Sequence, residues 1–317
     1  MEKELSRRTF LTTAAKTAAI TTAAWGLTGA SNAHAFFSAE EKAAVSKTGS
    51  RIVDIHMHFD DRNPGFIDDF LRASDQLNLT GCILTPFKSR KVVAEAAKQH
   101  PTRIIPMGYV DLDAPDVTKQ VAELHDLGYR GLGELEFVKK PFHDLSYFPV
   151  YDLANRYNWI VLFHTGIVLR EKFNEPEDVA SHRMRPLYLE EIARRFPQIT
   201  VVGAHCGNPE YEWAAEIARW NPNIFFDLSG STLKKFSGRL GEFSRYFWWT
   251  DTDEGTDTPD NNPSAFTKLV FGTDTSPRNV QQVLTQYRAL FEACNVPESA
   301  RQLILGGTLA KILRLPD

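Results

Sequence analysis

Short apolar runs alternate along most of the chain with longer segments that carry apolar residues at helical spacing. The short runs have the length of buried strands, and the longer segments have the length of helices. The pattern predicts eight strands, at residues 51–58, 80–86, 103–110, 129–136, 159–164, 199–205, 223–228 and 268–274. It predicts a helical segment after each of them, at residues 65–78, 89–99, 114–127, 149–157, 185–196, 209–220, 232–249 and 277–294.

Apolar strands that alternate with helices indicate a parallel sheet covered on its outer face. Eight such units in about 250 residues match the α/β class, as a single-domain (β/α)8 TIM barrel over residues 51–317. A doubly wound open sheet is the alternative, but no glycine-rich phosphate-binding turn follows the first strand. The acidic, turn-rich segment 250–263 is expected to be a surface loop, and residues 297–316 a closing helical tail.

The first 35 residues have the features of an export signal. Ser6-Arg7-Arg8-Thr9-Phe10-Leu11 is a twin-arginine pattern, and the Ala/Thr-rich stretch after it is too polar for a comfortable membrane-spanning helix. Ala33-His34-Ala35 offers a cleavage site with small residues on either side. We predict a twin-arginine signal peptide at 1–35, a polar lead-in at 36–50 and export to the periplasm. Whether the segment is cleaved or stays as a membrane anchor is left open, and an ordinary amphipathic helix is the alternative.

Composition and net charge limit the kinds of partner that the protein is expected to bind. The signal segment has four basic and two acidic residues, so its removal changes the formal net charge from −4 to −6. A net negative chain argues against nucleic acid and against a polybasic membrane anchor, because both need clustered positive charge. The hydrophobic content of 43% is ordinary for a globular protein. Three cysteines are too few for a disulfide framework, and Cys82 and Cys294 are expected in the core.

Histidine and carboxylate side chains recur where the predicted strands end. His56 and His58 end the first strand, two residues apart, so their side chains should point the same way. His164 ends the fifth strand, His205 the sixth and Asp274 the eighth. The carboxyl ends of barrel strands carry the active site, and three histidines with one carboxylate are typical of catalytic zinc. A strand-end coincidence could explain the His56 and His58 pair alone, but hardly all five residues.

These residues resemble the amidohydrolase superfamily, and in particular its amidohydrolase-related branch of metal-dependent barrels. The resemblance spans residues 51–317 and implies one divalent ion, most commonly zinc, held by His56, His58, His164 and Asp274. It places His205 beside the activated water or the substrate oxygen, and it makes Asp274 both a ligand and the general base. The motifs that carry it are Val53-Asp54-Ile55-His56-Met57-His58, Leu162-Phe163-His164-Thr165-Gly166, Val202-Gly203-Ala204-His205-Cys206-Gly207, Phe271-Gly272-Thr273-Asp274 and Ile304-Leu305-Gly306-Gly307.

Other polar residues are candidates for substrate binding. Glu134 and Glu136 end the fourth strand, where some superfamily members place a ligand that bridges a second metal. The lysine typical of that role is absent, so we expect a carboxylate here, Glu136 in particular, to bind substrate instead. Arg170, Arg185 and Arg278 could each bind a substrate carboxylate through two hydrogen bonds, although a solvated or ion-paired surface position is the alternative for each.

The sequence thus predicts a metal-dependent hydrolase, in which activated water attacks the carbonyl of a small lactone, ester or amide. The first alternative is a non-oxidative, metal-dependent decarboxylase of the same branch, because His205 and Asp274 suit both reactions. The second alternative is an exported metal-binding protein without catalysis. Export favours hydrolysis over a catabolic decarboxylation. The expected partner is a small-molecule substrate, and a homodimer is left open.

Overall fold

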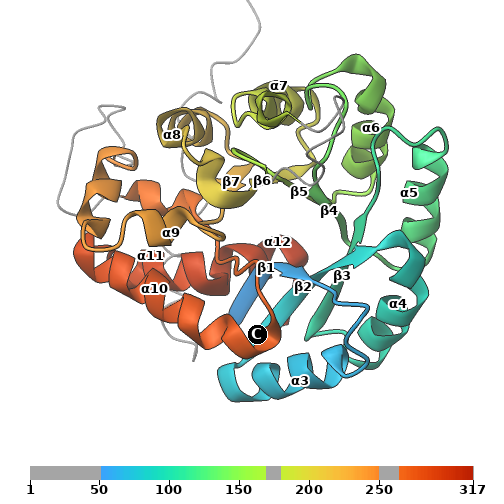
Figure 1. The fold of residues 1–317 in the computed structure, drawn as a ribbon, viewed down its shortest axis with the longest axis horizontal. Coiled ribbons are helices and arrows are strands. Elements are labelled where there is room, and N and C mark those ends of the chain that lie inside the picture. The colour runs from blue at the N-terminus through green and yellow to red at the C-terminus, as the bar shows by residue number, and fades with distance from the viewer. Residues whose placement is uncertain (1–50, 169–179, 250–263, 317) are drawn as a thin grey trace, which may run out of the picture.

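The computed structural model describes residues 51–168, 180–249 and 264–316. Seven parallel strands form one curled sheet in chain order, and most helices lie around its outside (Figure 1). The strands are β1 (Ile52–His58), β2 (Leu79–Pro86), β3 (Ile104–Tyr109), β4 (Gly131–Leu135), β5 (Ile160–Phe163), β6 (Thr200–Gly203) and β7 (Ile224–Phe226). The α-helices are α3 (Phe66–Leu77), α4 (Arg90–Gln99), α5 (Val117–Asp126), α6 (Phe148–Arg156), α7 (Tyr188–Arg195), α8 (Tyr211–Trp220), α9 (Thr232–Lys235), α10 (Val280–Ala293), α11 (Glu298–Gln302) and α12 (Thr308–Leu313).

The eighth predicted strand is irregular. In the described part of the chain it makes only an isolated bridge, between Leu269 and Phe226. Its backbone nevertheless reaches both edges of the sheet: the amide of Val270 donates to Phe226 O at 2.9 Å, and the amide of Asp274 donates to His56 O at 2.7 Å. The segment therefore lies between β7 and β1 and joins them. The prediction of an α/β barrel holds, with seven regular strands and this irregular connection in place of eight strands.

The mostly helical stretch predicted over residues 232–249 is present as two short segments with a break between them. The structure has the four-residue helix α9 and a 3₁₀ segment, Leu240–Arg245. Gly238 lies between them with φ +80°, a left-handed backbone that a continuous helix cannot contain. The closing tail is helical, as α11 and α12. The predicted signal peptide, the lead-in and the loop 250–263 lie outside the described residues.

Two apolar clusters form the core. The outer cluster packs the sheet against the surrounding helices, and the inner cluster fills the curled sheet with strand residues such as Val53 and Cys82. Helix α12 adds Leu309 and Leu313 to the inner cluster. Leu313 O accepts a hydrogen bond from Arg130, the residue before β4, so α12 covers the end of the barrel where strands begin. The opposite end, where strands finish, carries the polar side chains.

Irregular strand pairing turns the polar residues of β1 and β4 inward. The β1–β2 register shifts between Asp54 and Met57, and Met57 packs in the outer cluster. Since neighbouring strand residues face opposite sides, His56 and His58 then face the interior. The β4–β5 register shifts between Leu132 and Leu135, which both pack in the outer cluster and leave Glu134 to face inward.

No helix in the described ranges is long and apolar enough to span a bilayer.

Candidate metal centre

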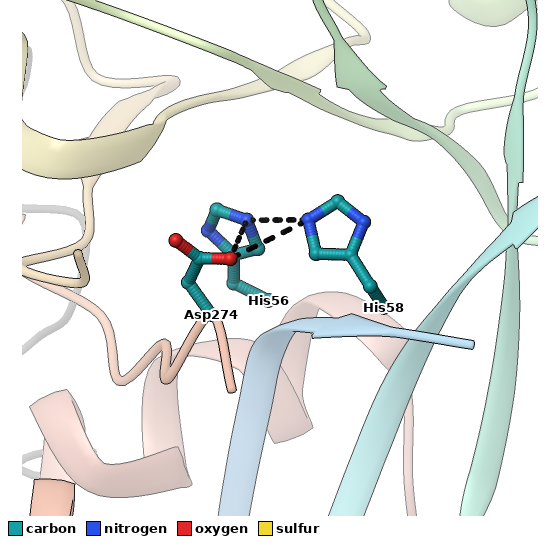
Figure 2. A group of neighbouring side chains, drawn as sticks. All are labelled: His56, His58 and Asp274. Carbon is teal, nitrogen blue, oxygen red and sulfur yellow. Dashed lines mark hydrogen bonds and ion pairs between the residues drawn. The ribbon is translucent and has the colours of Figure 1, made fainter. Parts of the chain in front are cut away.

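The first group of side chains joins the end of β1 to the segment after β7. His56 Nε2 lies 3.1 Å from His58 Nε2. Asp274 Oδ1 lies 3.7 Å from His56 Nε2 and 3.6 Å from His58 Nε2. Figure 2 shows the two imidazoles and the carboxylate turned toward one another. His56 is fully buried, whereas the side chains of His58 and Asp274 are 44% and 32% exposed, so this group faces both protein and solvent.

The second group joins β4, β5 and the residues after β6 around Glu134. Glu134 Oε1 lies 2.9 Å from His164 Nδ1 and 3.4 Å from His205 Nε2. Its other oxygen, Oε2, lies 3.1 Å from His56 Nε2 and 3.3 Å from His58 Nε2. The buried carboxylate of Glu134 therefore stands between the two groups and presents one oxygen to each. The sequence prediction put His164 with the first group, whereas the structure places it with Glu134 and His205.

The charges of this cluster depend on one another. Burial alone would lower the pKa of His56, but the carboxylates of Glu134 and Asp227 outweigh it and hold that pKa well above its usual value. Burial would raise the pKa of Glu134, but His56 and hydrogen bonds from His164 and His205 hold it well below its usual value. The pKa of His205 is raised against its burial, chiefly by Glu134. Carboxylate and imidazole thus stabilise each other's charged forms in the buried part of the site.

Asp227 and Ser229 form hydrogen bonds with the Nδ1 atoms of two histidines, His56 and His205. The sequence analysis identified neither residue. Asp227 Oδ2 lies 2.9 Å from His56 Nδ1, and Ser229 Oγ lies 2.9 Å from His205 Nδ1. Asp54, two residues before His56, accepts hydrogen bonds from the His56 backbone amide and from the Thr273 hydroxyl, and burial raises its pKa to about 7. It therefore fastens the end of β1 to the segment before Asp274.

The donor set fits a divalent metal. The Nε2 atom of His164 is buried and has no hydrogen-bond partner in the structure, which is costly for an imidazole nitrogen unless another group satisfies it. Each group offers imidazole nitrogen and carboxylate oxygen atoms that lie within 4.8 Å of one another. Mixed nitrogen and oxygen donors at close quarters are the ligands of zinc and related ions.

The remaining predicted substrate residues belong to neither group of histidines and carboxylates, or they lie outside the described residues. Glu136 follows β4 and is half-buried, and neither of the two groups found among the described residues includes it. Arg170 lies outside the described residues. Arg185 forms an ion pair with Glu210, with Nη2 and Oε1 2.6 Å apart.

A cavity of about 670 Å³ opens beside His58 and Asp274, between the loop after β1 and the turn before α10. Arg278 lines it and forms an ion pair with Asp69, with Nη2 and Oδ2 3.0 Å apart. The charged residues of its lining, apart from His58, are Asp60, Asp61, Asp69, Asp274, Arg62 and Arg278. Arg62 also pairs with a lining aspartate, Asp60, at 3.2 Å, so carboxylates outnumber guanidinium groups and both guanidinium groups are already paired.

The sequence matches the model of a protein family described as amidohydrolase, over residues 87–315. The matched range includes Glu134, His164, His205 and Asp274 and begins after His56 and His58. Among curated proteins, none matches the chain.

Solved structures with a similar fold include an uncharacterised TIM-barrel protein from Bordetella bronchiseptica, with TM-score 0.59 and 15% identity over 84% of this chain and 99% of that one. 5-Carboxyvanillate decarboxylase from Sphingomonas paucimobilis has TM-score 0.56 and 12% identity, over 84% of this chain and 100% of its own. A probable 2-pyrone-4,6-dicarboxylic acid hydrolase from Acinetobacter baumannii has TM-score 0.53 and 15% identity, over 83% and 99% of the two chains. At this identity the similarity shows a shared fold, and these neighbours include both decarboxylases and hydrolases.

Proposed function

Because the chain belongs to the amidohydrolase family, as its strand-end motifs predicted, we propose that it is a metal-dependent hydrolase. Its reaction is the attack of water on the carbonyl of a small lactone, ester or amide. The observation that carries this proposal is the cluster around Glu134, in which four imidazoles and two carboxylates meet at the carboxyl ends of the strands. Export through the twin-arginine pathway to the periplasm belongs to the same proposal and rests on the N-terminal motif.

The two groups of side chains would each hold one divalent ion, most simply zinc, with Glu134 shared between them. This departs from the single ion that the sequence implied, because Glu134 presents a different oxygen to each group. Zinc suits ligands that are mostly imidazole with carboxylate. When bound, such an ion polarises a carbonyl and lowers the pKa of water from about 15.7 to about 7.

Asp274 is placed to move the proton. Its carboxylate lines the cavity, within 4 Å of both His56 and His58, and is the most accessible carboxylate of the cluster. It accepts a proton from the attacking water and returns it to the leaving group. We assign His205 to the ligands rather than to the substrate oxygen, because its Nε2 faces the Glu134 carboxylate.

The cavity favours hydrolysis of a neutral substrate. A decarboxylase must hold the carboxylate that it removes, and a guanidinium whose charge is already balanced by an aspartate attracts a second anion less strongly. Arg278 and Arg62 line the cavity but already pair with Asp69 and Asp60. A neutral lactone, ester or amide needs no such cation. Decarboxylation remains the second candidate, because decarboxylases are among the structural neighbours.

The test is a substrate screen on purified, zinc-loaded protein with its metal content measured by mass spectrometry. We expect up to two zinc ions per chain and hydrolysis of at least one class of neutral lactone, ester or amide. Carbon dioxide release from an aromatic acid library would instead establish the decarboxylase. Metal binding without turnover in either library would support the non-catalytic alternative, and a folded chain that bound no divalent ion would contradict the proposal.

A further inference from the structure

Asp227 is a fully buried carboxylate that directly follows β7 and lies at the base of the metal centre. Its Oδ2 atom lies 2.9 Å from Nδ1 of His56. Its Oδ1 atom accepts a hydrogen bond from the hydroxyl of Ser229 at 2.6 Å, and two more from the backbone amides of His205 and Ser229 at 2.9 Å each. The charge of His56 and the hydrogen bonds from His56 and the Ser229 hydroxyl outweigh burial and keep the pKa of Asp227 below its usual value, so this carboxylate acts as an acceptor.

Ser229 extends this contact to a second imidazole. Its Oγ atom lies 2.9 Å from Nδ1 of His205 and 3.2 Å from Nδ1 of His56, whose nearer partner is Asp227. A hydroxyl has one proton, and here that proton goes to Asp227. The Ser229 oxygen can therefore only accept from His205, which must carry a proton on Nδ1.

The two imidazoles consequently share one orientation. Each donates from Nδ1 toward Asp227, His56 directly and His205 through Ser229. Each presents Nε2 to Glu134, at 3.1 Å from Oε2 for His56 and 3.4 Å from Oε1 for His205. The Nε2 atom is the one that needs a free lone pair to bind a metal, and a hydrogen bond from the other nitrogen fixes that tautomer and raises ligand basicity.

We propose that Asp227 and Ser229 are positioning residues that set the ligand tautomer of one histidine in each group from a single buried carboxylate. Asp227 acts on His56 of the first group, and Ser229 relays the same carboxylate to His205 of the second. The inference rests on the proposed metal-binding function, but the hydrogen bonds that it describes join residues of this chain and can be tested separately from metal binding. Loss of Ser229 therefore distinguishes the two groups experimentally. It removes the contact of His205 and leaves the Asp227 contact of His56 in place.

The experiment compares Ser229→Ala with Ser231→Ala. Ser231 stands two residues further along the same turn, is exposed, and accepts a hydrogen bond from Asn208 rather than from a histidine. In zinc-loaded protein titrated with a chelator, Ser229→Ala should weaken the retention of one class of ion about 10- to 100-fold, and Ser231→Ala should retain zinc as the wild type does. Asp227→Asn should weaken the retention of both classes.

Nuclear magnetic resonance of nitrogen-15-labelled histidine detects the Nδ1 proton in the hydrogen bond between His205 and Ser229 directly. Wild-type protein should show slowly exchanging Nδ1 protons for His56 and His205, and Ser229→Ala should lose only that of His205. Unchanged His205 resonances and unchanged zinc retention in Ser229→Ala would overturn the inference. If wild-type protein bound no zinc, the proposed function would fail, while the Nδ1 protons would still decide whether Asp227 and Ser229 fix the two tautomers.

Discussion

Asp274 combines two properties that make it the sharpest single-residue test of the proposed reaction. Its carboxylate is within 4 Å of His56 and His58, and its backbone has φ +49°, in the left-handed region. Asparagine tolerates that region well, so Asp274→Asn should keep the fold while removing the base. We expect turnover to fall by at least about 100-fold, with the thermal midpoint nearly unchanged. The measurement is kcat and a melting curve on the same preparation.

The matched control is Asp60→Asn. Asp60 lines the same cavity, but its carboxylate pairs with Arg62 and belongs to neither histidine group among the described residues. It should keep wild-type kcat to within a few-fold. Equal losses in both variants would mean that the charge of the cavity matters rather than a proton acceptor at Asp274.

At the scale of single residues, the sequence could locate the clustered histidines and Asp274 but not the side chains that bind their Nδ1 atoms. His56, His58, His164, His205 and Asp274 each end a predicted strand, and a barrel brings strand ends together. Asp227 also lies at the end of a predicted strand, 223–228, but that position does not show that its carboxylate binds Nδ1 of His56, 171 positions away along the chain. That partnership depends on strand register and side-chain direction, which residue order alone does not determine.

At the scale of elements, the turn between β7 and α9 holds His205 in place through a glycine. Gly230 has φ +65°, and a Cβ atom added there would lie 2.9 Å from His205 Nδ1 and 3.1 Å from its Cε1. Gly230→Ala should therefore push the imidazole from its position as well as strain the backbone. We expect weaker zinc retention of the second group, measured by chelator competition, together with a lower thermal midpoint.

Gly238→Ala separates these two effects. Gly238 has φ +80°, and a Cβ atom there would meet nothing within 4 Å. It should lose about 1 kcal/mol of stability through the positive φ alone and bind zinc like the wild type. Loss of zinc in both variants would show that general destabilisation, rather than contact with His205, explains the effect of Gly230→Ala.

Periodicity predicted most elements of the barrel, because buried strands and amphipathic helices leave clear patterns. It failed where the backbone departs from regular geometry. The segment before Asp274 follows the apolar pattern of a strand, yet its pairing is reduced to isolated hydrogen bonds with Phe226 and His56. Periodicity also could not show which of Glu134 and Glu136 faces the site, because the register shift between Leu132 and Leu135 determines the direction of these side chains.

At the scale of the whole molecule, the fold places reactive groups at one end of the curled sheet and buries the thiols in the two apolar clusters. Cys82, Cys206 and Cys294 are all free and buried, as predicted for Cys82 and Cys294. Cys82 is in the inner cluster, and Cys294 Sγ donates to Leu240 O at 3.3 Å. Burial raises the pKa of all three thiols, which lowers the fraction of the reactive thiolate.

We therefore expect native protein at pH 8 to react with a chromogenic disulfide reagent far more slowly than an exposed thiol does. In denaturant, the same sample should release the colour of all three thiols. The native rate then measures local opening of the fold around each thiol, because a buried thiol reacts only when the residues that cover it move away. Rapid native labelling of even one cysteine would contradict its burial. Thiols protected in this way would also survive unpaired in an oxidising compartment, which is the condition that the proposed export imposes.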